Sequence, residues 1–324
     1  MKRHFTIIFL TAVFLTAMPL SACSQTTALV SVSVTDMKED ASYTSPTVSQ
    51  AMMGTPVKIT DHKSYWYKIT TPEGYQGWTT EMNVSIITDE EFRKWKDSPR
   101  GIVTSYFETI MSAPDKDSDV IGNCIMGNIL ETTGETENGY FAVMIPGVGK
   151  GYIPCTALSP FKETLETMEV SEETIAATAE KFLGFPYLWG GLSPMGLDCS
   201  GLVKLSYFLN GIILKRDAKE QICTGERIEV TPDFKNLKKG DLVFFGTPAS
   251  ASAPAKVTHV GIYIENGEFI HSSLIVRRNN LAPGRNDSYT RKKIVGACRI
   301  LGHQDLEEGI TSILKHPWYF NIDE

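Results

Sequence analysis

Short alternating runs of apolar and polar residues fill the first half of the chain, between about residues 29 and 159. Val30, Val32 and Val34 alternate with serines, and Tyr65-Trp66-Tyr67-Lys68-Ile69 forms a second run. A period of two over such short runs is typical of strands with one buried face. The mixed charges at 88–100 favour a short helical linker, and such a charge run usually faces solvent. We therefore predict β structure on both sides of a short helical linker.

Features of this half occur twice along the chain. Ser45-Pro46 and the later Ala51-Met52-Met53-Gly54 are echoed by Ala113-Pro114 and Cys124-Ile125-Met126-Gly127, and Gln76-Gly77-Trp78-Thr79 is echoed by Lys150-Gly151-Tyr152-Ile153. Recurrence in the same order indicates two copies of one structural unit. The order of features resembles that of bacterial SH3-like barrels. We therefore expect two small β-barrels, barrel 1 over 27–87 and barrel 2 over 101–160.

The pattern becomes helical at Ser171, which can cap a helix whose first turn is acidic. Apolar residues then follow at helical spacing up to Gly184: Ile175, Ala176, Ala179, Phe182 and Leu183. A loop leads to Asp198-Cys199-Ser200-Gly201 and to a second amphipathic helix over 202–209. Helices therefore open the second half of the chain.

Strand signals follow these helices. A turn at Lys239-Gly240 feeds an apolar run ending at Phe245, and an Ala/Ser/Pro stretch at 247–256 precedes a hairpin over 258–272. A last strand is expected within 295–300. The second half therefore has an α+β pattern over 171–302, with a C-terminal tail at 303–324.

Composition narrows the possible functions. The chain has 324 residues, 42% of them hydrophobic and 21% charged, which is ordinary globular usage and allows two or three domains. The net charge is -7 and no basic block is present, so we expect no nucleic-acid partner. The sequence shows no metal-ligand cluster and no nucleotide loop, so we expect no cofactor and no metal.

The N-terminus has the pattern of an export signal. Lys2 and Arg3 precede an apolar run from Phe5 to Leu20 that is short for a membrane-spanning helix. The run ends in Leu20-Ser21-Ala22-Cys23, which resembles the bacterial lipobox. That resemblance implies removal of residues 1–22, a lipid on Cys23, and a mature protein anchored at the cell envelope, in the periplasm or at the outer membrane. The alternative is an ordinary signal peptide with an incidental cysteine.

Cys199 is the cysteine placed at the start of a predicted helix. Free N–H groups and the helix dipole at that position can stabilise a thiolate, which would make Cys199 a nucleophile. The alternative is a small buried side chain, the usual role of a free cysteine. A nucleophilic thiol needs a base, and a base works best when a third group orients it. His259 and His271 in the predicted hairpin could fill these two roles.

The hairpin register tests this pairing. A two-residue loop at Asn266-Gly267 would place His259 and His271 on opposite faces of the sheet. A three-residue loop over 265–267, with Gly267 left-handed, would place both on one face as diagonal neighbours. We therefore predict the three-residue loop and a positive φ at Gly267. With the two-residue loop, His271 could not orient His259.

Residues 171–302 resemble the NlpC/P60 family of papain-like cell-wall peptidases. The motifs Pro-Tyr-x-Trp-Gly-Gly, Asp-Cys-Ser-Gly, Gly-Asp-Leu-Val-Phe-Phe and His-Val-Gly-Ile-Tyr-Ile stand in the family's order. With two SH3-like barrels in front, the chain is similar to the subgroup that cleaves γ-D-glutamyl–diamino acid bonds in peptides with a free N-terminal L-Ala. The resemblance implies that Cys199 is the nucleophile, His259 the base and His271 the orienting residue.

The same resemblance implies a set of substrate contacts. The backbone N–H of Cys199 and the Tyr187 hydroxyl would hold the oxyanion, and Asp217 would bind the free amine of the substrate. Ala218 stands where the family often has Ser, so a hydroxyl contact there is lost. Tyr75 of barrel 1, with Glu39 or Asp40, would close the groove, although Tyr75 could instead be a barrel-core aromatic. The remaining expected substrate-binding residues are Trp189, Asp198 and Ser200.

Several alternatives stay open at this point. Cys124, Cys155, Cys223 and Cys298 are expected to be packing residues, although two disulfides are arithmetically possible. The leading function is a peptidase acting on peptidoglycan-derived peptides as a monomer. The alternatives are an endopeptidase acting on intact cell wall and a non-catalytic wall-binding lipoprotein.

Overall fold

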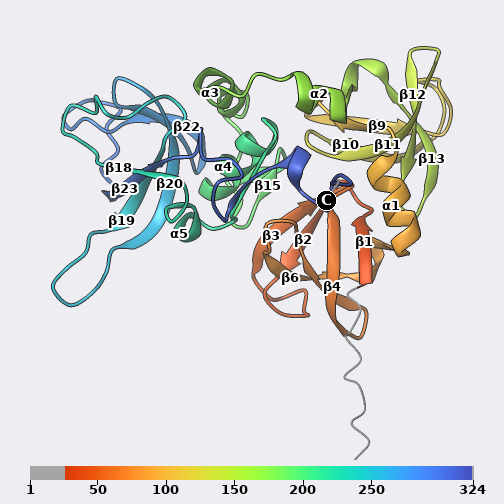
Figure 1. Ribbon diagram of the computed structural model, residues 1–324, viewed down its shortest axis with the longest axis horizontal. Helices are drawn as coiled ribbons and strands as arrows, with labels where there is room; N and C mark the ends of the chain where they lie inside the picture. The colour runs from red at the N-terminus through yellow and green to blue at the C-terminus, as the bar shows by residue number, and fades with distance from the viewer. Residues whose placement is uncertain (1–25, 323–324) are drawn as a thin grey trace, which may run out of the picture.

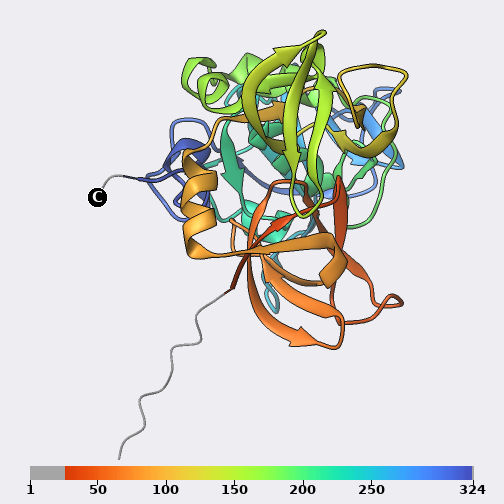
Figure 2. The ribbon, with the colours of Figure 1, turned by 90° about the vertical axis from the view of Figure 1, so that its right-hand side faces the viewer.

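The structure, a computed structural model, describes residues 26–322. The expected signal at 1–22 and the expected lipid site Cys23 lie outside these residues. Figure 1 shows two small sheets, coloured red-orange and yellow-green, on one side of the molecule and a larger sheet in blue on the other. Helix α4 lies between the blue sheet and barrel 1, and Figure 2 shows the same parts from the side.

Barrel 1 is a seven-stranded antiparallel sheet with the order β3-β2-β6-β5-β4-β1-β7. The Met53-Gly54 turn separates β3 from β4, and Gly54 has a φ of +78°, a conformation that favours glycine. The strands are β1 (Thr26–Val30), β2 (Val34–Lys38), β3 (Thr47–Met52), β4 (Pro56–Lys63), β5 (Trp66–Thr70), β6 (Gln76–Thr80) and β7 (Val84–Ile87), with a 3-10 turn η1 (Glu81–Asn83).

Barrel 2 has the same strand order, β10-β9-β13-β12-β11-β8-β14, so the sequence echoes correspond to equivalent positions in two sheets. Gly127, at the position of Gly54, also has a positive φ of +92°. The strands are β8 (Arg100–Val103), β9 (Phe107–Met111), β10 (Val120–Ile125), β11 (Ile129–Glu137), β12 (Tyr140–Ile145), β13 (Gly149–Pro154) and β14 (Leu158–Pro160), with η2 (Cys155–Ala157) before β14.

The linker between the barrels contains helix α1 (Asp89–Asp97). Thr88 and Glu91 form a capping box, and the positive charges of Lys94 and Lys96 in the last turn interact favourably with the helix dipole. Phe92 and Trp95 are the buried residues of this helix. The charged stretch is therefore an amphipathic helix whose apolar side packs into the protein.

The second half is built around a six-stranded antiparallel sheet, ordered β18-β23-β19-β20-β21-β22. Helix α4 (Cys199–Phe208) packs through Leu202 and Leu205 on Val260 and Ile270 of this sheet. The strands are β18 (Glu226–Ile228), β19 (Leu242–Thr247), β20 (Lys256–Glu265), β21 (Glu268–Ser273), β22 (Ile275–Asn280) and β23 (Lys293–Arg299). The other elements before the sheet are α2 (Phe161–Thr167), α3 (Glu172–Glu180), β15 (Leu192–Ser193), β16 (Gly196–Leu197), β17 (Ile212–Leu214) and α5 (Ala218–Gln221).

The segment after residue 302, expected to be a tail, is part of the fold. Its strand β24 (Ile310–Ser312) pairs with β17, and η3 (Ile313–Lys315) follows. Tyr319 and Phe320 are buried against Phe161 of α2. The spacing of apolar residues could not predict that this segment packs on the rest of the protein, because nothing in the sequence marks which surface it would cover.

One hydrophobic core joins the three parts of the chain. Met52 of barrel 1 and Ile129 of barrel 2 belong to the same buried cluster as Leu205 of α4. The barrels therefore have fixed positions relative to the catalytic half. Between residues 26 and 322, no helix is long and apolar enough to cross a membrane.

Candidate active site

Cys199 is the first residue of α4, at the floor of a cavity of about 300 Å³. The helix begins there because the Asp198 carboxylate accepts the N–H of Gly201 at 2.7 Å, which satisfies a free donor of the first turn. The backbone N–H groups of Val260 and Ser200 act on the Cys199 thiol and lower its pKa. Because Val260 directly follows His259, the thiol lies beside the strand that carries the expected base.

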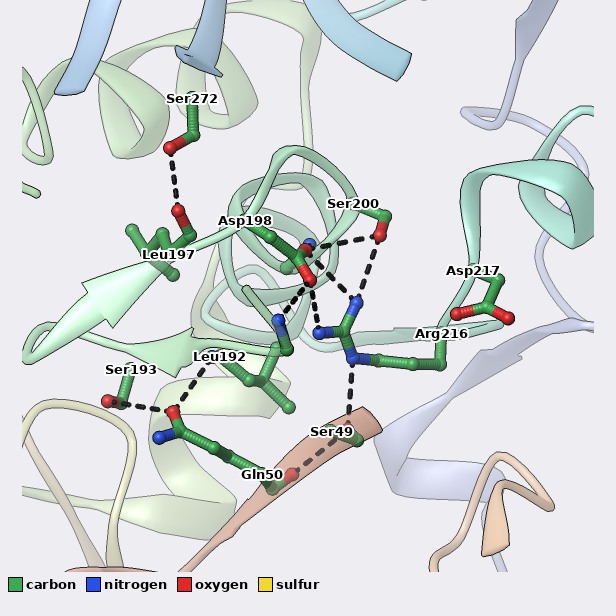
Figure 3. Close-up of polar contacts among 12 residues, drawn as sticks. Ser49, Gln50, Leu192, Ser193, Leu197, Asp198, Ser200, Arg216, Asp217 and Ser272 are labelled. Carbon is green, nitrogen blue, oxygen red and sulfur yellow. Dashed lines mark hydrogen bonds and ion pairs between the residues drawn. The ribbon is translucent and has the colours of Figure 1, made fainter. Parts of the chain in front are cut away.

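A buried ion pair fixes the start of this helix. Arg216 is 1% exposed, and its two terminal nitrogens contact the Asp198 carboxylate oxygens at 2.7 and 3.1 Å. Arg216 also donates to the hydroxyls of Ser200 and Ser49, each at 2.9 Å. Figure 3 shows the guanidinium group between the first turn of α4 and β3 of barrel 1. The ion pair therefore positions the nucleophile's helix against another domain.

The hairpin brings His259 and His271 together, but not by the predicted loop. Glu265 pairs with Glu268, so the loop is the two-residue Asn266-Gly267 turn, and the three-residue prediction is wrong. A β-bulge between Tyr263 and Glu265 shifts the register by one residue and places both histidines on the same face. The predicted positive φ of Gly267 is confirmed at +81°. The expectation that a two-residue loop would place His259 and His271 on opposite faces is wrong, because it did not allow for a β-bulge.

Asn279 fixes the protonation of both rings. The Asn279 side-chain NH₂ donates to the carbonyl of Asp287 at 2.7 Å, so its Oδ1 faces His271 Nε2 at 2.9 Å. His271 must then carry a proton on Nε2, which leaves Nδ1 of the neutral ring as an acceptor. That Nδ1 lies 2.6 Å from His259 Nε2, so His259 donates there and keeps its own Nδ1 unprotonated. His259 is thereby held in the tautomer of a base.

Sequence reasoning missed Asn279. Asn279 pairs with Phe269 across β21 and β22, and His271 pairs with Arg277, so Asn279 and His271 are diagonal neighbours. The signal was available only from the register of this second hairpin. That register depends on a turn at Leu274, whose φ of +69° is uncommon for a side chain of this kind.

The reactive groups are neutral in the free site. Burial, and next the Asp198 carboxylate, raise the pKa of the Cys199 thiol, the N–H groups of Val260 and Ser200 lower it, and the result is about 11. Burial also lowers the pKa of His259, and His271 beside it lowers it further. The expected effect of the helix N-terminus on the thiol is therefore outweighed by desolvation. A thiol in this state would first have to give up its proton before it could attack.

Tyr187 and Trp189 both line the cavity, as expected of groove residues. Burial raises the pKa of Tyr187 to about 12, with Cys199 and Asp198 adding to the shift. The Tyr187 hydroxyl therefore stays protonated and can donate to an oxyanion next to the thiol. Trp189 is 68% exposed, which leaves one side of its ring open to a ligand.

Barrel 1 contributes Tyr75 to the cavity wall. Tyr75 lines the cavity with Asp217 and Ala218 of the catalytic half, and it also packs on the core of barrel 1, so both interpretations hold. Burial and the nearby Asp217 carboxylate together raise the pKa of Tyr75 to about 12. A tyrosine hydroxyl and a carboxylate from two domains therefore meet at one end of the cavity.

Other expected contacts differ in the structure. Glu39 and Asp40 are exposed in the loop after β2 and are not among the residues that line the cavity. Asp198 and Ser200 line it, but their oxygens are bound to Arg216 and to the helix start. Both side chains therefore help to position the helix start, and their contact with substrate stays a prediction. Lining residues that the sequence did not indicate are Val48, Lys219, Val257 and Thr258.

The other described cysteines carry no disulfide. Cys124 and Cys298 are buried, as expected of packing residues, and Cys155 is half-buried. Cys223 is exposed, so the packing prediction is wrong for it. In residues 26–322, no group of three or more His, Cys, Asp or Glu side chains is arranged to hold a metal ion.

Comparison with known proteins gives two family matches. Residues 184–299 match the NlpC/P60 family, and residues 33–85 match the bacterial SH3 domain. The SH3 match covers barrel 1, whereas the assignment of barrel 2 to the SH3 class remains a prediction supported by its identical strand order.

Two relatives are similar over most of the chain. The γ-D-glutamyl-L-lysine dipeptidyl-peptidase of Bacillus cereus is 29% identical, over 78% of this chain and 75% of its own. Dipeptidyl-peptidase 6 of Lysinibacillus sphaericus is 31% identical, over 70% of this chain and 80% of its own. The crystal structure of an NlpC/P60 family protein from Bacillus cereus superposes with a TM-score of 0.70 at 22% identity, covering 84% of this chain and 99% of that one. This last likeness concerns the fold.

We expect Asn279→Ala to lower kcat by roughly 10-fold to 100-fold, because His259 loses its preferred tautomer while the rest of the cavity is kept. KM should change little. Asn280→Ala is the control, because Asn280 bonds the neighbouring loop through the Asn266 carbonyl and the Ala282 N–H. Steady-state kinetics with both variants test this; an unchanged kcat in Asn279→Ala would contradict the tautomer assignment.

The raised pKa of Cys199 predicts the pH dependence of its alkylation. The thiolate fraction rises with pH up to the folded pKa of about 11, so alkylation by iodoacetamide should accelerate about tenfold per pH unit between pH 7 and 10. The rate is followed on the free protein, and a Cys199→Ala variant supplies the contribution of exposed Cys223. A rate that levels off below pH 7 would show a preformed thiolate instead.

Proposed function

The chain belongs to the NlpC/P60 family of cysteine peptidases, and we propose that it hydrolyses the γ-D-glutamyl–diamino acid bond of cell-wall peptides with a free N-terminal L-Ala. The names of the Bacillus cereus relative and of a Bacillus subtilis relative, both γ-D-glutamyl-L-lysine dipeptidyl-peptidases, support this bond.

The proposal rests on one observation, that Tyr75 of barrel 1 and Asp217 line the same cavity as Cys199. A free amine is an ammonium ion at neutral pH, and the Asp217 carboxylate in a partly enclosed site would bind it strongly. The side chain of Asp217 is 29% exposed, so it remains open to the cavity. The Lys219 ammonium lies 3.3 Å from Asp217 in the free site. A substrate ammonium can compete for this carboxylate, whereas an uncharged acylated N-terminus cannot, which gives a physical reason for selectivity.

The first chemical step would form a thioester. The Cys199 thiol passes its proton to Nδ1 of His259 as the sulfur attacks the γ-carbonyl carbon of D-glutamate. The oxyanion is held by the Cys199 N–H and the Tyr187 hydroxyl. When the C–N bond breaks, protonated His259 gives its proton to the departing amine of the diamino acid. The L-Ala-γ-D-glutamyl group is then bound to the sulfur.

Water completes the reaction. His259, neutral again, takes a proton from a water molecule that attacks the thioester carbonyl carbon. As the C–S bond breaks, that proton returns to the sulfur, and L-Ala-γ-D-Glu leaves as the free acid. His271 and Asn279 keep His259 in the same tautomer for both steps.

We further propose that the protein acts outside the cytoplasm, anchored by a lipid on Cys23. The proposal rests on the basic start, the apolar run and the Leu20-Ser21-Ala22-Cys23 motif. Metabolic labelling with radioactive palmitate should mark the wild-type protein in its native host, and Cys23→Ala should lose the label. An unlabelled wild type that is still exported would indicate the ordinary signal peptide.

Asp217→Asn should lower kcat/KM for the free-amine peptide L-Ala-γ-D-Glu-diamino acid by roughly 10-fold to 100-fold, the worth of a charge-assisted contact. The N-acetylated peptide, which wild type should cleave poorly, should be no worse a substrate for the variant. Both rates are measured by separating the products.

Cys199→Ala supplies the blank in this assay, and Asp233→Asn, in an exposed loop, supplies a matched carboxylate control. Equal cleavage of both peptides by wild type would remove the role of Asp217 and favour an endopeptidase. Absence of turnover by wild type would favour the wall-binding alternative.

A further inference from the structure

A buried lysine–glutamate pair joins α4 to barrel 1. The Lys204 ammonium lies 3.3 Å from Glu73 Oε1, and the two side chains are 8% and 5% exposed. Neither residue takes part in the chemistry described above. Burying two charges costs free energy, and a well-packed apolar pair would often be more stable. The pair therefore calls for a role other than stability.

Glu73 lies in the turn that carries Tyr75. The Thr71 N–H donates to the Tyr75 carbonyl at 2.9 Å, and the Gly74 N–H donates to the Thr71 carbonyl at 2.8 Å. Gly74 has a φ of +86°, which this tight turn requires. Because the turn is closed on itself, a shift of Glu73 would be passed to Tyr75.

The C-terminal segment holds the same turn from a second side. His316 Nε2 lies 3.1 Å from the carbonyl oxygen of Pro72 and donates to it. His316 is 8% exposed, and Tyr319, from the same segment, is 2% exposed. Burial lowers the pKa of His316, so the ring is neutral and can donate one N–H to this carbonyl. The turn from Thr71 to Tyr75 is therefore held by α4 and by the end of the chain.

These contacts begin and end at the same helix, α4. Cys199 and Lys204 are separated by about 7.5 Å along the helix axis. Lys204 pairs with Glu73, which lies two residues before Tyr75, and Tyr75 lines the cavity together with Asp217. Arg216 is the neighbour of Asp217 in the chain. Its ion pair with Asp198 leads back to the start of α4, directly before Cys199. The tyrosine that closes the cavity is thus located by the helix that carries the nucleophile.

We propose that Lys204, Glu73 and His316 are positioning residues that hold Tyr75 against Asp217 and thereby set the preference for a free N-terminal amine. This inference rests on the proposed function. The segment around His316 then acts in substrate selection, although none of residues 303–322 lines the cavity.

The test measures the ratio of kcat/KM for L-Ala-γ-D-Glu-diamino acid to that for its N-acetyl form. Lys204→Met and Glu73→Gln should each lower this ratio about 5-fold to 30-fold, through a higher KM for the free-amine peptide. The exchanged pair Glu73→Lys with Lys204→Glu should recover part of the ratio. His316→Ala should lower it, and His316→Gln, which keeps an N–H donor, should restore it.

Asp241→Asn is the matched control, because it breaks another buried pair, Asp241 with Arg299 at 2.8 Å. It should lower the melting temperature and leave the ratio unchanged. The inference is overturned if folded Lys204→Met and His316→Ala both keep the wild-type ratio, or if Asp241→Asn lowers the ratio equally. If the Lys204 variants do not fold, the His316 pair decides. A wild type without any preference would refute the proposed function itself.

Discussion

The ion pair between Arg216 and Asp198 is the contact on which the site depends. Its two charges are removed from water, and such a pair is tolerable only when nearly every donor and acceptor is bonded. Here the same carboxylate caps α4, accepts the N–H of Gly190 and faces both terminal nitrogens of Arg216. The guanidinium group also reaches Ser49 of barrel 1. The helix start, the Trp189 loop and the barrel are therefore located by one pair of side chains, and Cys199 is located with them.

The two ends of the cavity differ in charge. At the reactive end, burial keeps Cys199 and His259 neutral, which avoids placing a thiolate and an imidazolium in a desolvated site before the substrate arrives. At the other end, Asp217 and Tyr75 present a negative carboxylate and a protonated hydroxyl to the cavity. A substrate with a positive N-terminus would be bound by charge at one end and cleaved by a neutral pair at the other.

The sequence predicted what depends on local pattern and missed what depends on assembly. The start of α4 at Cys199, the hairpin histidines and the repeated barrel strands all follow from spacing, capping and turn residues. Asn279 was missed because its neighbour in space is set by hairpin register. The contacts of Glu39 and Asp40 with substrate stay a prediction, because the docking of barrel 1 cannot be read from the sequence of the barrel. The Glu73–Lys204 pair lies between domains, where no periodicity reports a contact.

A crystal structure with the product dipeptide L-Ala-γ-D-Glu tests the account most directly, because it locates the amine and the reacting carbonyl in one measurement. The account predicts that the alanine nitrogen lies within hydrogen-bonding distance of the Asp217 carboxylate and the Tyr75 hydroxyl, with the γ-carboxyl carbon beside the Cys199 sulfur. A dipeptide whose γ-carboxyl lies at Cys199 but whose amine points into solvent, away from Asp217 and barrel 1, would contradict it.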